Sequence, residues 1–360
     1  MSIYLDCAAA GRSDRETTAF YLAAMAEDYA NQEALHTPAY NARQRLKASE
    51  KELISALLPG NEEYSVLWST SATECFRILA EYLSGTDTLT STLEHPALTA
   101  NFRRLTRMSQ LACDRSGKLI LPEIPGKFAA VILHHVQSET GNIQDLPQLF
   151  AAFPDALKIA DSVQSAGKLP LSPVPDIHIV SGVKFGAPGG AAILCRKSCA
   201  HCGKLEKHVK KMRSVDYVLS RVNVPLCRTM AFAASRCAEF SKADFELISE
   251  LNTRLRKKLE ELSIFPLLPP ETPASPYIAN FFLPGILAAV VVRALSERGI
   301  HCASGSACAA EAGGPSPALL ALGRSRQDSY SGLRISFDRY STAGDVDFLV
   351  SELKNVLKNY

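Results

Sequence analysis

The stretch Ile177-His-Ile-Val-Ser181-Gly-Val-Lys184-Phe-Gly-Ala-Pro-Gly-Gly190 decides the fold of this chain. Four β-favouring residues run into Ser-Gly-x-Lys, a Gly/Pro-rich turn follows, and Ala191-Ala-Ile-Leu-Cys195 is a second apolar run. This pattern predicts a strand, a tight turn and a second strand. It places Lys184 at a strand end, where burial lowers the pKa of an amine and lets it react with an aldehyde cofactor. The alternative is an ordinary strand-end lysine in water.

A second stretch, upstream, supplies partners for such a cofactor. Lys158-Ile-Ala-Asp161-Ser-Val-Gln164 is a buried-strand pattern that ends in an aspartate, with a glutamine three residues further on. An aspartate there can hold a pyridinium N–H, and the glutamine can donate to a phenolate oxygen, as the ring of pyridoxal phosphate (PLP) requires when it acts as an electron sink. With these two stretches the chain resembles the class V aminotransferase superfamily, and within it the cysteine desulfurases.

A phosphate cradle is predicted where a strand over 66–69 leads through Thr70-Ser-Ala-Thr-Glu74 into an apolar helix. Free N–H groups and the positive end of the helix dipole face an anion at such a helix start. A simple N-cap by one of the hydroxyl groups gives the same pattern. The resemblance implies that Ala72 and Thr73, which match the family's Gly-Ala-Thr-Glu segment, hold the phosphate of PLP, although Ser71 replaces the glycine.

The resemblance assigns further residues to the same site. His95, in Glu-His, matches the histidine that stacks on the PLP ring and moves protons, and Ser181 is the small hydroxyl beside Lys184. Ser138 stands where the family has an asparagine near the cofactor and the substrate carboxylate; it reaches less far and offers one donor rather than two. Val183 replaces the histidine of the family's Ser-Gly-His-Lys. A lone histidine such as His95 is also compatible with a purely structural role.

A third motif, His301-Cys-Ala-Ser-Gly-Ser-Ala-Cys308-Ala-Ala310, predicts an accessible loop of small residues with a thiol. A thiol becomes a nucleophile when a base or a positive charge lowers its pKa. The resemblance makes Cys308 the sulfur-accepting cysteine. It also makes Arg334 the residue that grips the substrate α-carboxylate, which suits a planar guanidinium. The alternatives are a buried small residue at 308 and a strand-edge salt bridge at 334.

Three cysteines follow the second strand. Cys195, Cys199 and Cys202 have a spacing that thiolates use to ligate an iron–sulfur cluster or zinc, with His201, Cys227 or Cys237 as the fourth ligand. The alternative is a cysteine cluster in a surface loop, because the fourth ligand is not local.

Composition limits the remaining possibilities. The chain has 360 residues, 47% hydrophobic and 21% charged, which suits a soluble globular protein of two domains. A net charge of +2 gives no case for nucleic acid. The longest apolar run, near 286–292, stops at Arg293, short of the ~20 residues that span a bilayer. Ten cysteines without a signal peptide predict free thiols in a reducing compartment, the cytoplasm, and no membrane association.

The fold that the resemblance implies is PLP fold type I, an α/β architecture with a mostly parallel seven-stranded sheet. We expect a large PLP-binding domain over 13–243 and a small α+β domain from 1–12 and 244–360. The implied activity is PLP-dependent cysteine desulfurase: L-cysteine gives L-alanine and a Cys308 persulfide for an acceptor protein in iron–sulfur cluster or thio-cofactor assembly, in a homodimer. The alternatives are an aminotransferase, a selenocysteine lyase, or a non-catalytic homologue that binds a partner or a metal cluster.

Overall fold

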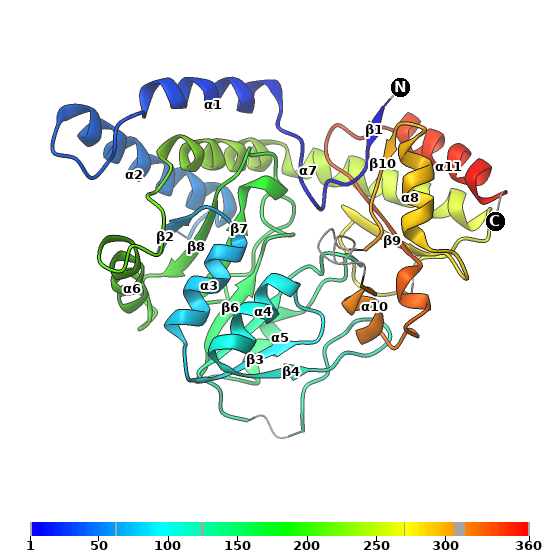
Figure 1. Cartoon of the computed structure of the whole chain (residues 1–360), viewed down its shortest axis with the longest axis horizontal. Helices are drawn as coiled ribbons and strands as arrows, with labels where there is room; N and C mark the ends of the chain where they lie inside the picture. Colours follow the sequence, from blue (N-terminus) through cyan, green and yellow to red (C-terminus); the bar gives the residue numbers. More distant parts are fainter. Residues whose placement is uncertain (1, 62, 124–125, 270, 306–313, 359–360) are drawn as a thin grey trace.

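A seven-stranded sheet forms the centre of the computed structural model, which describes residues 2–61, 63–123, 126–269, 271–305 and 314–358 (Figure 1). The strands lie in the order β2-β8-β7-β6-β5-β3-β4. Their bounds are β2 (Tyr64–Ser69), β3 (Asp87–Ser91), β4 (Arg107–Leu111), β5 (Ala130–His134), β6 (Leu157–Asp161), β7 (Ile177–Ser181) and β8 (Ala191–Arg196). Pairing is parallel from β4 through β7, whereas β8 runs antiparallel to β7 and β2. The predicted α/β class, the mostly parallel sheet and the strand-turn-strand around Lys184 are therefore confirmed.

Helices cover both faces of this sheet. They are α1 (Arg15–Glu27), α2 (Thr37–Leu57), α3 (Ala72–Tyr82), α4 (Pro96–Leu105), α5 (Leu146–Ala151), α6 (Cys202–Ser214) and α7 (Val224–Glu260). One apolar cluster joins α3, α4 and α6 to one face, and another joins α2 and α7 to the opposite face. Since both faces are covered, the inner strands are continuous apolar runs, and every residue of β5 is buried. A polar side chain at the end of such a strand therefore needs a separate explanation.

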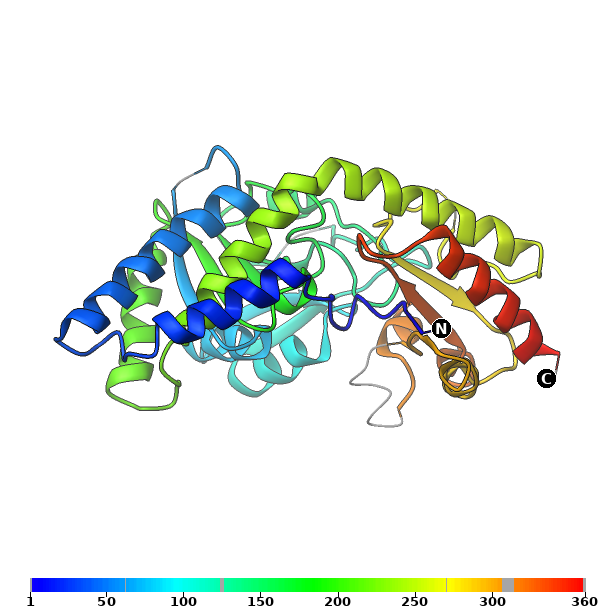
Figure 2. The same cartoon turned by 90° about the horizontal axis from the view of Figure 1, so that it is seen from above.

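The two ends of the chain come together beside the large sheet (Figures 1 and 2). The elements here are β1 (Ile3–Tyr4), β9 (Ile278–Phe282), α8 (Ala288–Ser296), β10 (Ile300–His301), α10 (Pro317–Ala321), η2 (Asp328–Tyr330), β11 (Gly332–Ser336) and α11 (Ala343–Leu357). β1 pairs in parallel with β10, and β9 pairs antiparallel with β11. The sequence Thr342-Ala-Gly-Asp345 predicts a capping box, and a capping box of Thr342 and Asp345 begins α11. Residues from both termini thus share one apolar cluster.

Helix α7 extends along both halves of the molecule (Figure 2). Leu and Ile at helical spacing over 244–263 predict an amphipathic helix that links the two domains. In the structure α7 begins twenty residues earlier, at Val224, and the predicted domain limit at 243 lies inside it. Its first half packs Met230 and Ala234 into the cluster beneath α2, and its second half packs Leu251 and Leu255 against the small sheets. The prediction missed the first half because small buried residues there give little amphipathic contrast.

The start of α2 also differs from the prediction. The stretch 31–41, which contains His36 and Pro38, predicts a loop, but the helix begins at Thr37. His36 is its N-cap, with Nδ1 accepting from the N–H of Ala39 at 3.3 Å. Proline fits here because the first turn of a helix has N–H groups without intrahelical partners.

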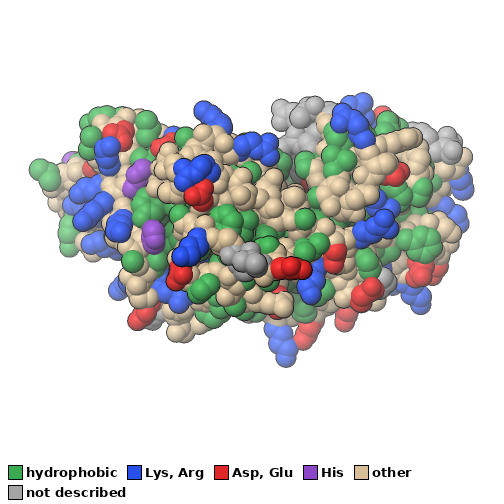
Figure 3. Space-filling model, turned by 90° about the horizontal axis from the view of Figure 1, so that it is seen from below, with side chains coloured by type: hydrophobic (Ala, Val, Ile, Leu, Met, Phe, Trp, Pro, Cys, Tyr) green, Lys and Arg blue, Asp and Glu red, His purple; other side chains and the backbone are tan. Residues whose placement is uncertain are grey.

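Charge is distributed over the surface rather than segregated. Figure 3 shows acidic and basic side chains over the face seen from below, with Lys and Arg more frequent toward the end that carries α6. Among the helices of the described residues, none combines the length and the apolar character needed to cross a bilayer.

Candidate active site

The start of α3 forms the predicted anion cradle. β2 ends at Ser69, and Ser71 caps the helix by accepting from the N–H of Glu74 at 3.2 Å. The Glu74 carboxylate folds back and accepts from Ser69 Oγ at 2.6 Å and from the Thr70 N–H at 2.9 Å. Burial raises the pKa of Glu74, but these hydrogen bonds outweigh it and lower the pKa below its usual value. The first N–H groups of α3, those of Ala72 and Thr73, are thereby left at the cavity wall for an anion.

Asp161, Ser181 and Lys184 lie at the carboxyl edge of neighbouring parallel strands. Asp161 ends β6, Ser181 ends β7, and Lys184 ends the short helical turn η1 (Gly182–Lys184). Asp161 Oδ1 accepts from the N–H of Val163 at 3.0 Å. Lys184 Nζ donates to the carbonyl of Ala9 at 2.5 Å. Ligands of open α/β sheets bind outside this edge, so the three residues share the expected location.

The N-terminal segment closes one side of the same site. Gln164 Nε2 donates to the carbonyl of Ala8 at 2.9 Å, next to the Ala9 carbonyl that holds Lys184. The N–H of Ala8 in turn donates to Ser336 Oγ at 2.9 Å, on β11. The amide of Gln164 is thus oriented by backbone that comes from the far end of the chain.

Arg334 is buried at 2% exposure on β11 and faces the site from the small sheet. Nη1 donates to the carbonyl of Ser138 at 2.9 Å, and Nη2 donates to Asp6 Oδ1 at 2.7 Å. Nε is buried and has no hydrogen-bond partner among the described residues. Ser138, predicted as a side-chain contact to substrate, contributes its carbonyl oxygen to the positioning of Arg334.

His95 caps α4 with its ring. Nδ1 accepts from the N–H of Ala97 at 3.1 Å, which assigns the proton of a neutral ring to Nε2. Burial, together with the positive charges of Lys184 and Arg334, lowers the pKa of His95 to about 4. His95 is therefore neutral at pH 7 and offers Nε2–H as a donor to the cavity that it lines.

These elements enclose a cavity of about 260 Å³. All nine predicted cofactor- and substrate-binding residues line it: Ala72, Thr73, His95, Ser138, Asp161, Gln164, Ser181, Lys184 and Arg334. Cys308 lies outside the described residues.

The three cysteines with metal-ligand spacing lie away from this cavity. Cys195 and Cys202 are buried and Cys199 is half-buried, all in the apolar cluster between β8, α3 and α6. Burial raises the pKa of Cys195 and of Cys199 above the usual value. Cys227 and Cys237, two of the expected fourth ligands, belong to the cluster on the opposite face of the sheet. In the described part of the chain no three His, Cys, Asp or Glu side chains are arranged to hold a metal ion, so the geometry does not support that prediction.

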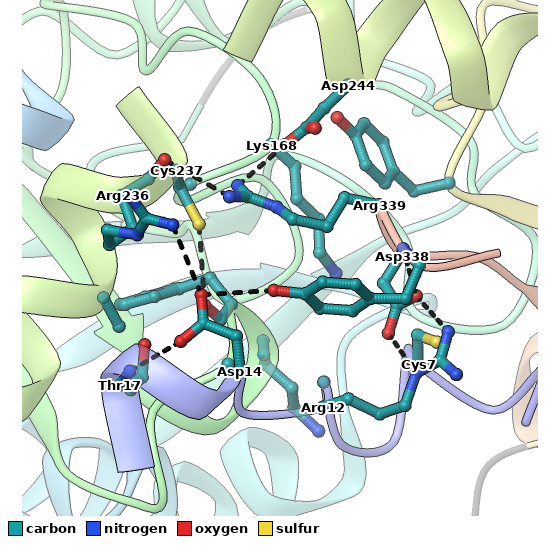
Figure 4. Close-up of a pocket in the computed structure, with 18 of the residues that line it drawn as sticks. Cys7, Arg12, Asp14, Thr17, Lys168, Arg236, Cys237, Asp244, Asp338 and Arg339 are labelled. Carbon is teal, nitrogen blue, oxygen red and sulfur yellow. Dashed lines mark hydrogen bonds and ion pairs between the residues drawn. The ribbon is translucent and has the colours of Figure 1, made fainter. Parts of the chain in front are cut away.

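A second cavity has a volume of about 50 Å³ (Figure 4). Lys184 belongs to the lining of both cavities. Ion pairs surround this second cavity: Arg12 with Asp338, Arg236 with Asp14, and Arg339 with Asp244. They join the N-terminal segment and α7 to the loop after β11. The charges within each of these pairs compensate one another.

Sequence reasoning missed three residues of the site. Asp6 pairs with Arg334, and Glu94 pairs with His134, which also lines the larger cavity. The signal for His134 was a histidine at the end of an otherwise apolar strand. Glu94 adjoins His95, and Asp6 follows the first strand, but the partner of each in the site, His134 or Arg334, lies far away in the sequence.

The chain is similar to known proteins over nearly its whole length. A family model described as Aminotransferase class-V matches residues 3–349. A protein named cysteine desulfurase IscS, from Anaeromyxobacter sp. (strain Fw109-5), is 25% identical over 97% of this chain and 90% of its own length. One named putative cysteine desulfurase NifS, from Bacillus subtilis (strain 168), is 24% identical over 97% of this chain and 93% of its own. The structure of a NifS-like protein from Rickettsia africae superposes with a TM-score of 0.88 at 19% identity, over 99% of this chain and 100% of that one, a likeness of fold.

Proposed function

Because the chain belongs to the class V aminotransferase family, we propose that it is a PLP-dependent cysteine desulfurase that converts L-cysteine to L-alanine and keeps the sulfur as a persulfide on Cys308. The observation that carries this proposal is the meeting of Lys184, Asp161 and Arg334 around one cavity. The names of the curated relatives support the choice of reaction.

The residues of the cavity fit PLP. The first turn of α3 would hold its phosphate, Asp161 its pyridine nitrogen and Gln164 its phenolate oxygen, with Lys184 at its aldehyde carbon. The Nε2 of His134 is buried at the cavity and has no hydrogen-bond partner among the described residues, which indicates a site built for a polar ligand. When bound, PLP supplies an electron sink that no side chain provides.

The protein's own groups then have separate tasks. Arg334 binds the α-carboxylate of L-cysteine with the part of its guanidinium that Asp6 and Ser138 leave open. Lys184 takes and returns the proton at Cα. His95 is neutral, and its Nε2–H is available to donate to a ligand in the cavity that His95 lines.

The proposed role of Cys308 is supported by the position of Ala303, five residues before it in the sequence. Ala303 exchanges both backbone hydrogen bonds with Arg334, at 3.1 and 2.8 Å, so the chain leaves this point beside the carboxylate-binding arginine. Five extended residues span roughly 17 Å. The thiolate of Cys308 therefore has the reach to attack the substrate sulfur, take it as a persulfide and leave alanine.

The test is an assay of alanine and reductant-released sulfide from L-cysteine. We expect Lys184→Ala to lose the visible absorbance of bound PLP and Cys308→Ser to lose sulfide formation. Cys113→Ser is the matched control. The thiol of Cys113 donates to the carbonyl of Ala321 at 3.3 Å, and Cys113 does not line the cavity. Full sulfide release by Cys308→Ser, or amino transfer to a 2-oxo acid without sulfide, would contradict the proposal.

We further propose a homodimer that acts in the cytoplasm and passes its sulfur to an acceptor protein for cluster or thio-cofactor assembly. Exposed apolar side chains along α1, along its connection to α2 and in the first turn of α2 support the dimer. They are Leu22, Met25, Tyr29, Leu35 and Tyr40. The nine described cysteines are all free thiols, which suits a reducing compartment.

A further inference from the structure

Glu94, His134 and Asp161 stand side by side at the carboxyl edge of three adjacent strands. Asp161 ends β6, His134 ends β5, and Glu94 follows β3, the next strand in the sheet. His134 and Asp161 are register partners in the parallel pair, so their side chains leave the sheet on the same face. His134 therefore lies between two carboxylates, and both His134 and Asp161 line the cofactor cavity.

Glu94 holds the His134 ring in one orientation. Its Oε1 accepts from His134 Nδ1 at 2.9 Å, from the His134 backbone N–H at 3.2 Å and from Ser91 Oγ at 2.6 Å. The two side chains are 4% and 0% exposed. With Nδ1 committed to Glu94, only Nε2 of the ring remains for another group, and it has no hydrogen-bond partner among the described residues.

The charges of the three groups depend on one another. Burial lowers the pKa of His134, but Glu94 outweighs burial, so the pKa is raised and the ring favours the cation. Burial raises the pKa of Asp161 to about 6, and the negative charge of Glu94 adds to this rise, whereas His134 and Lys184 oppose it. His135, which directly follows β5, has a pKa lowered to about 4 by burial and by the charge of His134. Without a positive ring between them, Glu94 and Asp161 would be two buried carboxylates in one site.

We propose that His134 is a positioning residue that, as a cation between Glu94 and Asp161, keeps Asp161 ionised and so keeps a proton on the pyridine nitrogen of bound PLP. This inference rests on the proposed PLP-dependent function. His134 and Glu94 cancel each other, which leaves the charge of Asp161 to match that of the pyridinium. The electron sink depends on this proton. His134 acts through Asp161 and takes no part in bond making.

The experiment compares reconstituted wild type with His134→Gln, Glu94→Gln and the double variant. The ¹⁵N chemical shift of PLP labelled at the ring nitrogen reports the position of the proton. Affinity is measured for PLP and for an analogue with carbon in place of the ring nitrogen. We expect His134→Gln to move the signal toward neutral pyridine and to weaken PLP binding about tenfold, with unchanged affinity for the analogue.

Glu94→Gln and the double variant keep the test decisive if His134→Gln folds poorly. Glu94→Gln removes the opposing charge and should retain the pyridinium signal, and the double variant should recover PLP affinity to within about threefold of wild type. A pyridinium signal in His134→Gln, equal losses for PLP and the analogue, or a double variant no better than His134→Gln would overturn the proposal. Failure of wild type itself to bind PLP would instead refute the proposed function.

Discussion

Asp6 and Arg334, 328 residues apart in the chain, form an ion pair of 2.7 Å inside the candidate active site. Their side chains are 22% and 3% exposed. The pair is supported by backbone, because the N–H of Ser336 donates to the carbonyl of Leu5 at 2.8 Å. The arginine proposed to bind the substrate carboxylate is therefore oriented by the opposite end of the chain in the absence of substrate.

Asp6→Asn should weaken substrate binding more than catalysis. A buried guanidinium that loses its charged partner is less well fixed, because a neutral amide holds it with a weaker hydrogen bond. We expect KM for L-cysteine to rise about tenfold, equivalent to ~1.4 kcal/mol, with a smaller change in kcat. Steady-state kinetics of alanine formation measures both.

Asp87→Asn is the control for this substitution. Asp87 also forms an ion pair with an arginine, Arg107, through two hydrogen bonds of 2.7 and 2.8 Å. That pair is exposed on the surface, and neither residue lines the cavity. Exposed pairs contribute little, so its kinetics should match wild type. An unchanged KM in Asp6→Asn would show that Arg334 does not depend on its partner.

Substitutions at two helix caps distinguish an effect on anion binding from an effect on stability. Ser71 caps α3 at the cavity, and Thr342 caps α11 in the small sheet region. Replacing either with alanine should lower the free energy of unfolding by about 1 kcal/mol. Only Ser71→Ala should also weaken PLP binding, by about fivefold, because the cradle is the first turn of α3. Equal PLP affinity in the two variants, measured by fluorescence titration, would remove α3 from the phosphate site.

His95 predicts a pH dependence of stability. Its pKa in the folded protein is about 4, whereas an unfolded chain protonates histidine near pH 6.5. Between these values the unfolded chain binds more protons, so the free energy of unfolding falls as pH drops from 6.5 to 4, by up to about 3 kcal/mol. Urea unfolding at pH 7 and 4.5 should show this loss in wild type and a smaller one in His95→Gln. Equal losses would mean that His95 titrates normally.

Local patterns predicted the elements that line the larger cavity. The apolar strand before Asp161, the small residues before α3 and the turn at Lys184 each depend on a few adjacent residues, and each was found where expected. Parallel strands then bring their carboxyl ends to one edge, so residues read separately meet in one cavity.

Pairings across the chain could not be predicted in this way. The bond of Asp6 to Arg334 depends on how the two termini pack, and the bond of Glu94 to His134 depends on the order of β3 and β5 in the sheet. Neither sequence distance nor local periodicity contains that order. The start of α7 was missed for a different reason, since its buried face uses alanine rather than large apolar residues.

The exposed apolar surface of α1 predicts the effect of charge on assembly. Leu22 on α1 is 62% exposed, and Tyr29, two residues after the end of α1, is 77% exposed, although α1 itself packs on α7. Glutamate at both positions would place charge in the proposed dimer contact, where an unpaired carboxylate loses its hydration. We expect Leu22→Glu/Tyr29→Glu to sediment at half the mass of wild type.

Phe265→Glu is the control, because Phe265 is 55% exposed but lies after the end of α7, far along the chain from α1. It should leave the sedimenting mass of wild type unchanged. Burial of an apolar surface drives association in proportion to its area. Replacing two apolar side chains of this surface should therefore dissociate the dimer at micromolar protein concentration. A wild-type protein that sediments as a monomer at that concentration would leave the apolar surface of α1 to some partner other than a second copy of this chain.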